Sequence, residues 1–268
     1  MNAQSHVAWS DDGVPIHYDI LGNGTPALVF VHGWCCDRHY WDRQMSHFAS
    51  HYTVVSLDLA GHGASGCDRT QWTIPAFGGD VVAVIEQLGL GRDVLIGHSM
   101  GGAVIIEAAH RLSSAVIGLV GVDTWQNLRH TWTPEQIAER LAPFRTGFAE
   151  ATRSLVQTMF LPTSDAALVE RIVTAMSATP PQIGTAVGEY LLAYDDVMLG
   201  KLREVKAPKI AINSAEYRVT DTPAAQRCGI EVVFMSGVGH FVMIEDPQTF
   251  NRLLDEALKG LVHPSGPQ

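Results

Sequence analysis

A serine with the surroundings of a nucleophile stands near the middle of the chain. Ser99 is the central residue of Gly97-His98-Ser99-Met100-Gly101, which fits the pattern G-x-S-x-G. A short apolar run, Val94–Ile96, precedes the motif, and a helix-compatible run, Ala103–Leu112, follows it. Such a strand–turn–helix places a serine on a sharp, strained turn, where side chains in place of the two glycines would collide. The sequence therefore predicts a nucleophilic serine.

A serine hydroxyl is a weak nucleophile until a base takes its proton. His240 is the best candidate, because it follows the last expected strand and a glycine-rich turn over 236–239. His98 is too close in sequence to point its ring at the hydroxyl of its neighbour. Other histidines have simpler interpretations: surface positions for His6, His51, His110 and His263, and structural positions in glycine-flanked loops for His32 and His62.

The base needs a carboxylate that fixes its tautomer and stabilises the imidazolium. Asp123 ends the apolar run Val116–Val122. Adjacent parallel strands lie about 4.8 Å apart, so Asp123 and Ser99 would emerge at the same edge of a sheet. An aspartate here could also only cap a turn. The sequence favours Asp123 and leaves Glu216 and Asp221 as alternatives.

Two backbone N–H groups should stabilise the oxyanion that forms when the serine attacks a carbonyl. One is expected from Met100, the residue after the nucleophile, and the other from the loop His32-Gly33-Trp34, which follows an apolar run. Trp34 is the candidate donor there. Its side chain can pack at the same time, because the donor is main chain.

Short β runs alternate with helical segments along most of the chain, which predicts an α/β fold with a mainly parallel sheet. The helical segments of this alternating part are 40–49, 74–88, 100–112, 222–227 and 247–261. The expected strands are Ile16–Leu21, Ala27–Val31, Thr53–Leu57, Asp93–Ile96, Val116–Val122, Lys209–Asn213 and Ile230–Met235.

The alternation stops between residues 125 and 202, where no convincing strand is found. One helix starts after Thr133, with Pro134 in its first turn, and others are expected near 145–160, 164–178 and 182–199. We interpret residues 125–202 as a helical cap over the sheet, and residues 1–124 with 203–268 as the core domain. Large apolar side chains in the cap weakly favour a small to medium apolar ester as substrate; they are Trp125, Trp132, Phe144, Phe148, Met159, Phe160, Met176, Tyr190 and Tyr194.

Composition narrows the function further. The chain has 268 residues, 46% of them hydrophobic, and a net charge of −10. No basic patch suggests nucleic acid, and no run is long enough to span a membrane. The four cysteines match neither a zinc site nor a redox pair, so free thiols, no metal and a cytoplasmic location are expected.

Taken together, the motifs resemble those of the α/β-hydrolase superfamily. They cover nearly the whole chain: His32-Gly33-Trp34, Asp58-Leu59-Ala60-Gly61-His62-Gly63-Ala64-Ser65, the serine motif, and Gly239-His240-Phe241 before Glu245-Asp246-Pro247. The resemblance implies an eight-stranded sheet, a cap after the sixth strand, a structural role for Asp58, and cofactor-free hydrolysis through an acyl-enzyme. His32-Gly33-Trp34 with Ser99-Met100 is similar to the aryl-esterase and perhydrolase branch. That branch carries its acid where this chain has Tyr217, so the resemblance implies an acid moved to after strand six.

Three functions are therefore considered. The first is a carboxylic-ester hydrolase with Ser99 as nucleophile, His240 as base and Asp123 as acid. The second is a cofactor-independent dioxygenase that uses a His240–Asp123 dyad, with Ser99 only binding substrate. The third is a small-molecule sensor that keeps the hydrolase pocket. The sequence favours the first and does not indicate the oligomeric state.

Overall fold

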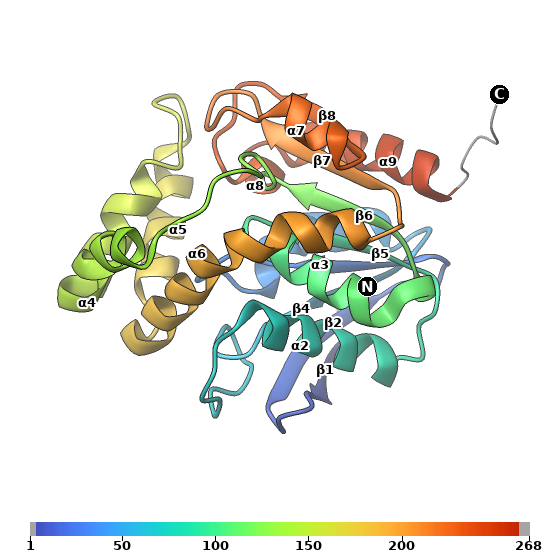
Figure 1. Cartoon of the computed structure of the whole chain (residues 1–268). Helices are drawn as coiled ribbons and strands as arrows, with labels where there is room; N and C mark the ends of the chain where they lie inside the picture. The colour runs from blue at the N-terminus through green and yellow to red at the C-terminus, as the bar shows by residue number, and fades with distance from the viewer. Residues whose placement is uncertain (1–3, 263–268) are drawn as a thin grey trace.

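A single eight-stranded sheet forms the centre of the protein in the computed structural model, which describes residues 4–262 (Figure 1). The strand order is β1-β2-β4-β3-β5-β6-β7-β8. β2 runs antiparallel to both of its neighbours, whereas β4, β3, β5, β6, β7 and β8 pair in parallel. The strands are β1 (Gln4–Trp9), β2 (Pro15–Leu21), β3 (Ala27–Val31), β4 (Thr53–Leu57), β5 (Asp93–His98), β6 (Val116–Val122), β7 (Lys209–Ser214) and β8 (Ile230–Met235). The expected α/β fold with eight strands is confirmed.

Helices cover both faces of this sheet. The helices are α1 (Asp42–Phe48), α2 (Ile74–Gln87), α3 (Met100–Leu112), α4 (Pro134–Gln157), α5 (Ala166–Ser177), α6 (Pro181–Glu204), α7 (Thr222–Arg227), α8 (Val242–Glu245) and α9 (Pro247–Val262). Short 3-10 turns span Arg38–Trp41 and Ser113–Ala115. None of the described helices is long and apolar enough to cross a membrane.

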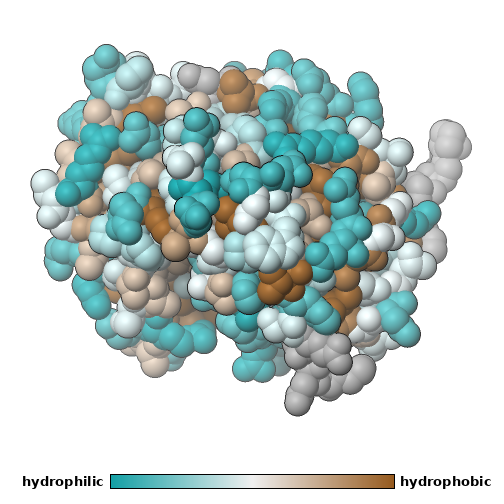
Figure 2. Space-filling view, turned by 90° about the horizontal axis from the view of Figure 1, so that it is seen from below, coloured by the Kyte–Doolittle hydropathy of each residue, from teal (hydrophilic) through white to brown (hydrophobic). Residues whose placement is uncertain are grey.

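Strand β3 shows why the core has two layers. All five of its residues are buried, as expected for a parallel strand that is covered on both faces. Val29 and Val31 face the layer formed with α2 and α3, while Leu28 and Phe30 face the layer formed with α1 and α9. Because successive side chains point to opposite faces, one apolar run supplies both layers. The outer surface seen from below is mostly hydrophilic, with apolar residues in small separate groups (Figure 2).

Strand β1 was not among the strands expected from the sequence. It pairs with β2 over six residues, from Gln4 opposite Ile20 to Trp9 opposite Pro15. The segment has few apolar residues because it is an edge strand. Ala8 is buried, but Trp9 is 66% exposed, so the alternation on which strand prediction depends is short and weak here.

The helices expected between 125 and 202 are present. The two expected between Thr133 and 160 meet at a kink inside α4, at Gly147, whose φ and ψ of −156° and 71° are not helical. Thr133 caps this helix as predicted, through a capping box with Gln136. The third expected helix corresponds to α5.

Helix α6 links the helical segment to the rest of the molecule. It continues five residues past the expected end and finishes at Glu204. Its C-terminal half packs along α3, where Tyr194 Oη donates a 2.7 Å hydrogen bond to Glu107 Oε1 and Lys201 pairs with the same carboxylate. The buried Glu107 is therefore held by two residues of α6. Figure 1 shows α4, α5 and the N-terminal part of α6 to one side of the sheet.

Asp93 yields a prediction about stability. Its carboxylate is buried at the start of β5, neither oxygen has a partner among the described residues, and burial raises its pKa to about 6. A raised acid pKa means that folding is opposed once the group ionises, so this cost appears as the pH rises from about 4 to 6. We expect Asp93→Asn to be more stable than the wild type by about 2 kcal/mol at pH 7.5, with the difference vanishing near pH 4.

Urea unfolding at the two pH values measures this difference. The matched control is Asp68→Asn, which removes an exposed carboxylate and should change the free energy of unfolding by less than about 0.5 kcal/mol. A difference for Asp93→Asn that does not vary with pH would contradict the explanation.

Candidate active site

Ser99 lies on a strained turn between β5 and α3. Its φ is 52° and its ψ is −114°, a conformation that costs a non-glycine residue about 1–3 kcal/mol. A Cβ at Gly97 would collide with the carbonyl of Gly101, and one at Gly101 would lie 2.5 Å from the carbonyl oxygen of Val31. The predicted strain at the serine and the need for both glycines are confirmed.

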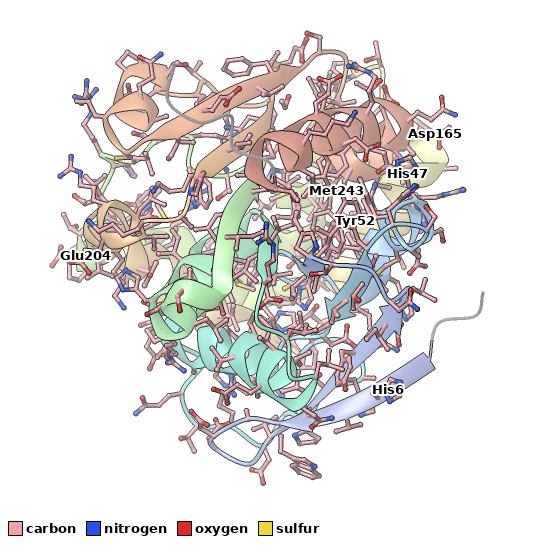
Figure 3. The ribbon with its side chains drawn as sticks, turned by 90° about the vertical axis from the view of Figure 1, so that its right-hand side faces the viewer. His6, His47, Tyr52, Asp165, Glu204 and Met243 are labelled. Carbon is pink, nitrogen blue, oxygen red and sulfur yellow. The ribbon has the colours of Figure 1, made fainter. Side chains whose placement is uncertain are left out.

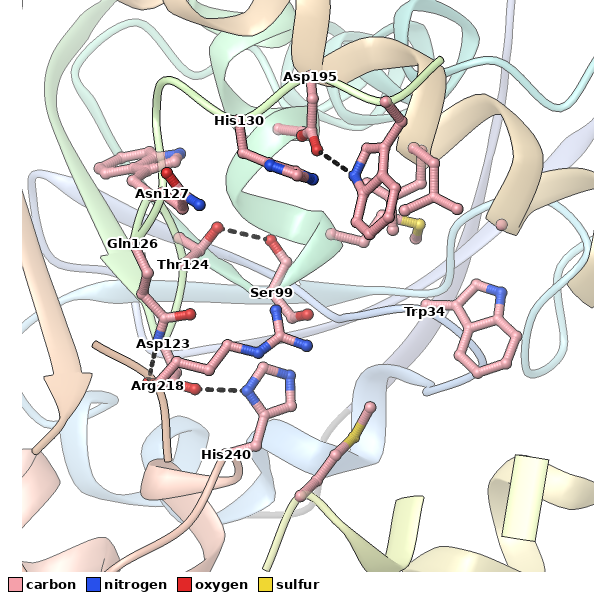
Figure 4. A pocket seen from close by; sticks show the side chains of 18 of the residues that line it. Trp34, Ser99, Asp123, Thr124, Gln126, Asn127, His130, Asp195, Arg218 and His240 are labelled. Atoms are coloured by element: carbon pink, nitrogen blue, oxygen red, sulfur yellow. Dashed lines mark hydrogen bonds and ion pairs between the residues drawn. The ribbon is translucent and has the colours of Figure 1, made fainter. Parts of the chain in front are cut away.

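Asp123 and His240 form a buried pair beside this turn (Figure 4). His240 Nδ1 lies 2.5 Å from Asp123 Oδ2, and the two residues are 5% and 1% exposed. β6, which Asp123 follows, pairs with β5, and the N–H of Ser99 donates to the carbonyl of Val122 at 3.0 Å. The sheet therefore brings the serine turn and the Asp123–His240 pair to the same edge, as expected for neighbouring parallel strands.

The second oxygen of Asp123 is also fully engaged. Asp123 Oδ1 accepts 2.8 Å hydrogen bonds from Gln126 Nε2 and from the backbone N–H of Ser214. These bonds fix the carboxylate so that Oδ2 faces the His240 ring. A carboxylate at this position accepts a hydrogen bond from the N–H at Nδ1 of His240. The other ring nitrogen, Nε2, is therefore the one that can take up a proton. The sequence analysis did not identify Gln126, because a glutamine three residues after an aspartate is common and gives no sign of a hydrogen bond between the two.

The other two candidate acids lie elsewhere. Glu216 is exposed, and its Oε1 accepts from the N–H of Gly237 at 3.2 Å. Asp221 caps α7 and pairs with Arg129 at 2.5 Å. Tyr217, which stands where the resembled branch carries its acid, instead packs its ring against His240 at 4.9 Å between centroids. Of the three carboxylates, the structure brings only Asp123 to His240.

The loop after β3 passes close to Ser99. A Cβ at Gly33 would lie 3.3 Å from Ser99 Cβ and 2.9 Å from His98 Nδ1, so only glycine allows this approach. His32 Nδ1 lies 2.8 Å from the Gly33 carbonyl, and His32 Nε2 accepts from the N–H of Leu59 at 3.0 Å. This pattern requires the neutral ring with its proton on Nδ1, and burial lowers the pKa of His32 accordingly.

The bond from His32 has a consequence for the backbone of Trp34. In a planar trans peptide the carbonyl and the N–H point in opposite directions. Holding the Gly33 carbonyl toward His32 therefore turns the Trp34 N–H away from His32. The Trp34 indole donates to the Gly184 carbonyl of α6 at 2.8 Å, so its side chain and backbone serve different contacts. Met100, the other expected donor, is the first residue of α3, where N–H groups have no partner within the helix.

Asp58 has a structural position. Its carboxylate accepts from the backbone N–H of Arg38 at 2.7 Å and of Ala64 at 2.8 Å, and it pairs with the Arg38 guanidinium. It thus ties the glycine-rich loop after β4 to the turn before α1. It does not line the cavity described below, in agreement with the structural role implied by the resemblance.

Ser99, Asp123 and His240 all line one cavity of about 590 Å³. Ser99 Oγ and His240 make no hydrogen bond within the part of the chain that the structure describes. Without substrate, nucleophile and base often lie slightly apart and approach only when substrate binds. An apolar wall is formed by Trp34, Leu141, Phe144, Leu155, Met159, Leu191, Leu192 and Met198. Polar groups on the lining include Gln126, Asn127, His130, Arg140, Asp195 and Arg218.

The cap side chains singled out from sequence divide into two groups. Trp125, Trp132, Phe144 and Met159 line the cavity. Phe148, Met176 and Tyr194 are buried in packing contacts, Phe160 stacks on Phe241, and Tyr190 is exposed. The sequence could not separate the groups because both occur at helical spacing.

Of the other histidines considered from the sequence, His98 contacts His240, whereas His6 and His51 lie elsewhere. His6 lies on the edge strand β1 and stacks on Tyr18 (Figure 3), His51 is exposed, and His263 lies outside the described residues. His98 Nε2 donates a 3.0 Å hydrogen bond to the carbonyl of His240, and the His98 ring packs 4.6 Å from the His240 ring. His98 therefore helps to hold His240 in place and does not itself line the cavity.

His130, which the sequence analysis did not single out, lines the cavity and packs edge-on against Trp132 at 4.4 Å. Only the fold reveals it, because it lies in an irregular segment before α4. All four cysteines are free thiols, as expected.

Comparisons with known proteins agree with this architecture. The non-heme chloroperoxidase of Streptomyces lividans is 40% identical over 114 residues, which cover 41% of this chain and 40% of that protein. The dihydrolipoyllysine-residue acetyltransferase component of the acetoin cleaving system of Cupriavidus necator is 28% identical over 93% of this chain and 68% of that protein. The aligned part thus spans well under two thirds of the chloroperoxidase.

A thermophilic esterase from Thermogutta terrifontis has a similar fold, with a TM-score of 0.83 and 21% identity over 97% of this chain and 99% of that one. The sequence profile of the alpha/beta hydrolase family matches residues 28–253, which is most of the chain. The protein therefore belongs to the alpha/beta hydrolase family.

Proposed function

We propose that this hydrolase cleaves carboxylic esters through an acyl-enzyme. The observation that carries the proposal is the buried Asp123–His240 pair, with 2.5 Å between Oδ2 and Nδ1, on a cavity that Ser99 lines from a strained turn. Nucleophilic catalysis needs this combination: a hydroxyl presented to the cavity by a tight turn, a base on the same cavity, and a carboxylate that orients the base. The esterase of similar fold supports the same reaction class.

In the proposed reaction, Ser99 Oγ attacks the ester carbonyl while His240 Nε2 takes the hydroxyl proton. Asp123 stabilises the imidazolium that results. His240 then gives this proton to the leaving alcohol oxygen as the C–O bond breaks, which leaves an acyl group on Ser99. A water molecule, deprotonated by His240, attacks the acyl carbon, and the acid departs as Ser99 regains its proton.

The negative charge on the carbonyl oxygen would be stabilised by the N–H groups of Trp34 and Met100. The contact between Gly33 and Ser99 supports this role, because it brings the loop against the nucleophile. The bond from His32 to the Gly33 carbonyl supports it further, because it orients the following peptide. Loss of one such donor costs about 3–4 kcal/mol of transition-state stabilisation in serine hydrolases.

The first experiment removes the nucleophile. We expect Ser99→Ala to lower kcat for p-nitrophenyl butyrate by on the order of 10⁴-fold or more, because no acyl-enzyme can form. Initial rates measured by release of p-nitrophenol test this, with thermal melting as the control for folding. Activity within tenfold of the wild type would rule out the acyl-enzyme and favour the dioxygenase alternative, in which Ser99 only binds substrate.

The second experiment separates the candidate acids. Asp123→Asn keeps the size of the side chain but presents an amide to His240, so we expect kcat to fall by about 10³–10⁴-fold. Glu216→Gln is the matched control and should stay within about twofold of the wild type, because Glu216 is exposed and its carboxylate accepts from the N–H of Gly237. The reverse result, a near-normal Asp123→Asn and an inactive Glu216→Gln, would contradict the assignment.

A further inference from the structure

Two arginines line the cavity from distant parts of the chain. Arg218 lies in the loop after β7, and Arg140 lies on α4. In Figure 4 the Arg218 side chain extends into the cavity alongside His240. Both residues are exposed, so their charged groups are accessible to a molecule in the cavity.

Among the side chains that the structure describes, neither arginine forms an ion pair. The chain has fourteen arginines and 28 acidic residues, and eight of these arginines form no ion pair among the described side chains. Six other arginines do form ion pairs: Arg38, Arg69, Arg129, Arg145, Arg153 and Arg252. The two carboxylates on the cavity lining are engaged elsewhere, Asp123 with His240 and Asp195 with the Trp132 indole at 3.1 Å. The cavity thus has two guanidinium groups available for an anion.

Aromatic rings hold both guanidinium groups in place. Arg218 Cζ lies 4.9 Å from the centroid of the Tyr217 ring, and Arg140 Cζ lies 5.1 Å from that of Trp132. A guanidinium that stacks on a ring keeps its N–H edge free for a planar anion. Burial raises the pKa of the Tyr217 hydroxyl, and both arginines oppose that effect, which places their charges near the same hydroxyl.

The position of Tyr217 indicates which half of an ester would meet the arginines. His240 must protonate the leaving oxygen, so the alcohol portion of the substrate starts at His240. The Tyr217 ring packs against His240, and the Arg218 guanidinium lies over the Tyr217 ring. The acyl portion starts beside the proposed oxyanion donors, and the ring of Trp34, which carries one of them, packs edge-on against Phe144 at 5.7 Å. The alcohol portion therefore extends toward positive charge and the acyl portion toward apolar surface.

We propose that the site takes esters with an apolar acyl group and an alcohol portion that carries an anion such as a carboxylate, bound by Arg218 and Arg140. This deepens the proposed function and rests on it. The sequence favoured a small to medium apolar ester, and the arginines limit that expectation to the acyl half of the substrate.

The test compares 4-butanoyloxybenzoate with its neutral methyl ester, each rate being divided by that of spontaneous hydrolysis. We expect the wild type to prefer the carboxylate. Arg218→Gln should lower kcat/KM for the carboxylate by about tenfold, as for the loss of a hydrogen bond to a charged group, and Arg140→Gln by a smaller factor. Neither variant should change kcat/KM for the methyl ester by more than about threefold.

Arg145→Gln is the matched control, because Arg145 also lies on α4 but pairs with Glu189 and does not line the cavity. It should leave both substrates unchanged. The wild-type preference should also weaken at high salt, since exposed charges are screened. Equal losses on both substrates in Arg218→Gln, or no wild-type preference, would overturn the inference.

The two proposals fail in different ways. If the methyl ester is hydrolysed in a Ser99-dependent manner but the arginine variants do not discriminate, only the assignment of the anionic alcohol is wrong. If neither ester is hydrolysed by the folded wild type, the proposed ester hydrolysis itself is wrong.

Discussion

The pairing of β5 with β6 is the constraint on which the site depends. The residue directly after each strand has a positive φ: 52° for Ser99 after β5 and 45° for Asp123 after β6. Both residues therefore leave their strands at a sharp turn instead of continuing along the sheet. The register that places His98 beside Val122 puts the two turns next to each other. A slip in that register would move a carboxylate away from His240 and leave the buried imidazole without a partner, which is costly in a dry site.

The support for this edge comes from several separate elements. Ser214 at the end of β7 and Gln126 after β6 hold the same carboxylate oxygen. His98 contacts the backbone and ring of His240, and His32 fixes the peptide before Trp34. Neutral histidines suit these positions because each ring offers one donor and one acceptor in a buried place where a charge would be unfavourable. Of His32, His98 and His240, only His240 lines the cavity.

Much of this arrangement could be predicted from the sequence, for identifiable reasons. The serine turn, His240 and Asp123 stand at the ends of strongly apolar strands, where periodicity and glycine spacing are clear. Strand β1 was missed because an edge strand buries little, whereas the two helices expected within α4 agree with the non-helical conformation of Gly147. Gln126, His130, Arg140 and Arg218 could not be found, since each is an ordinary polar residue until the fold brings it to the cavity. The expected preference for an apolar ester rested on the large side chains of residues 125–202. The sequence does not show which of those side chains line the cavity, so it could not indicate the charged groups beside them.

Helix α6 carries a consequence for how this protein could be re-engineered. Its first half presents Gly184 to Trp34, and its second half is fastened to α3 by Glu107. A boundary at residue 202, near its end, treats as cap a stretch that is bonded to the core. Exchange of the segment for that of a relative would join cleanly only where the helix has not yet met α3, well before Tyr194. A chimera joined after Tyr194 would leave the buried Glu107 carboxylate without its partners. The transplanted segment would therefore have to supply equivalents of Tyr194 and Lys201.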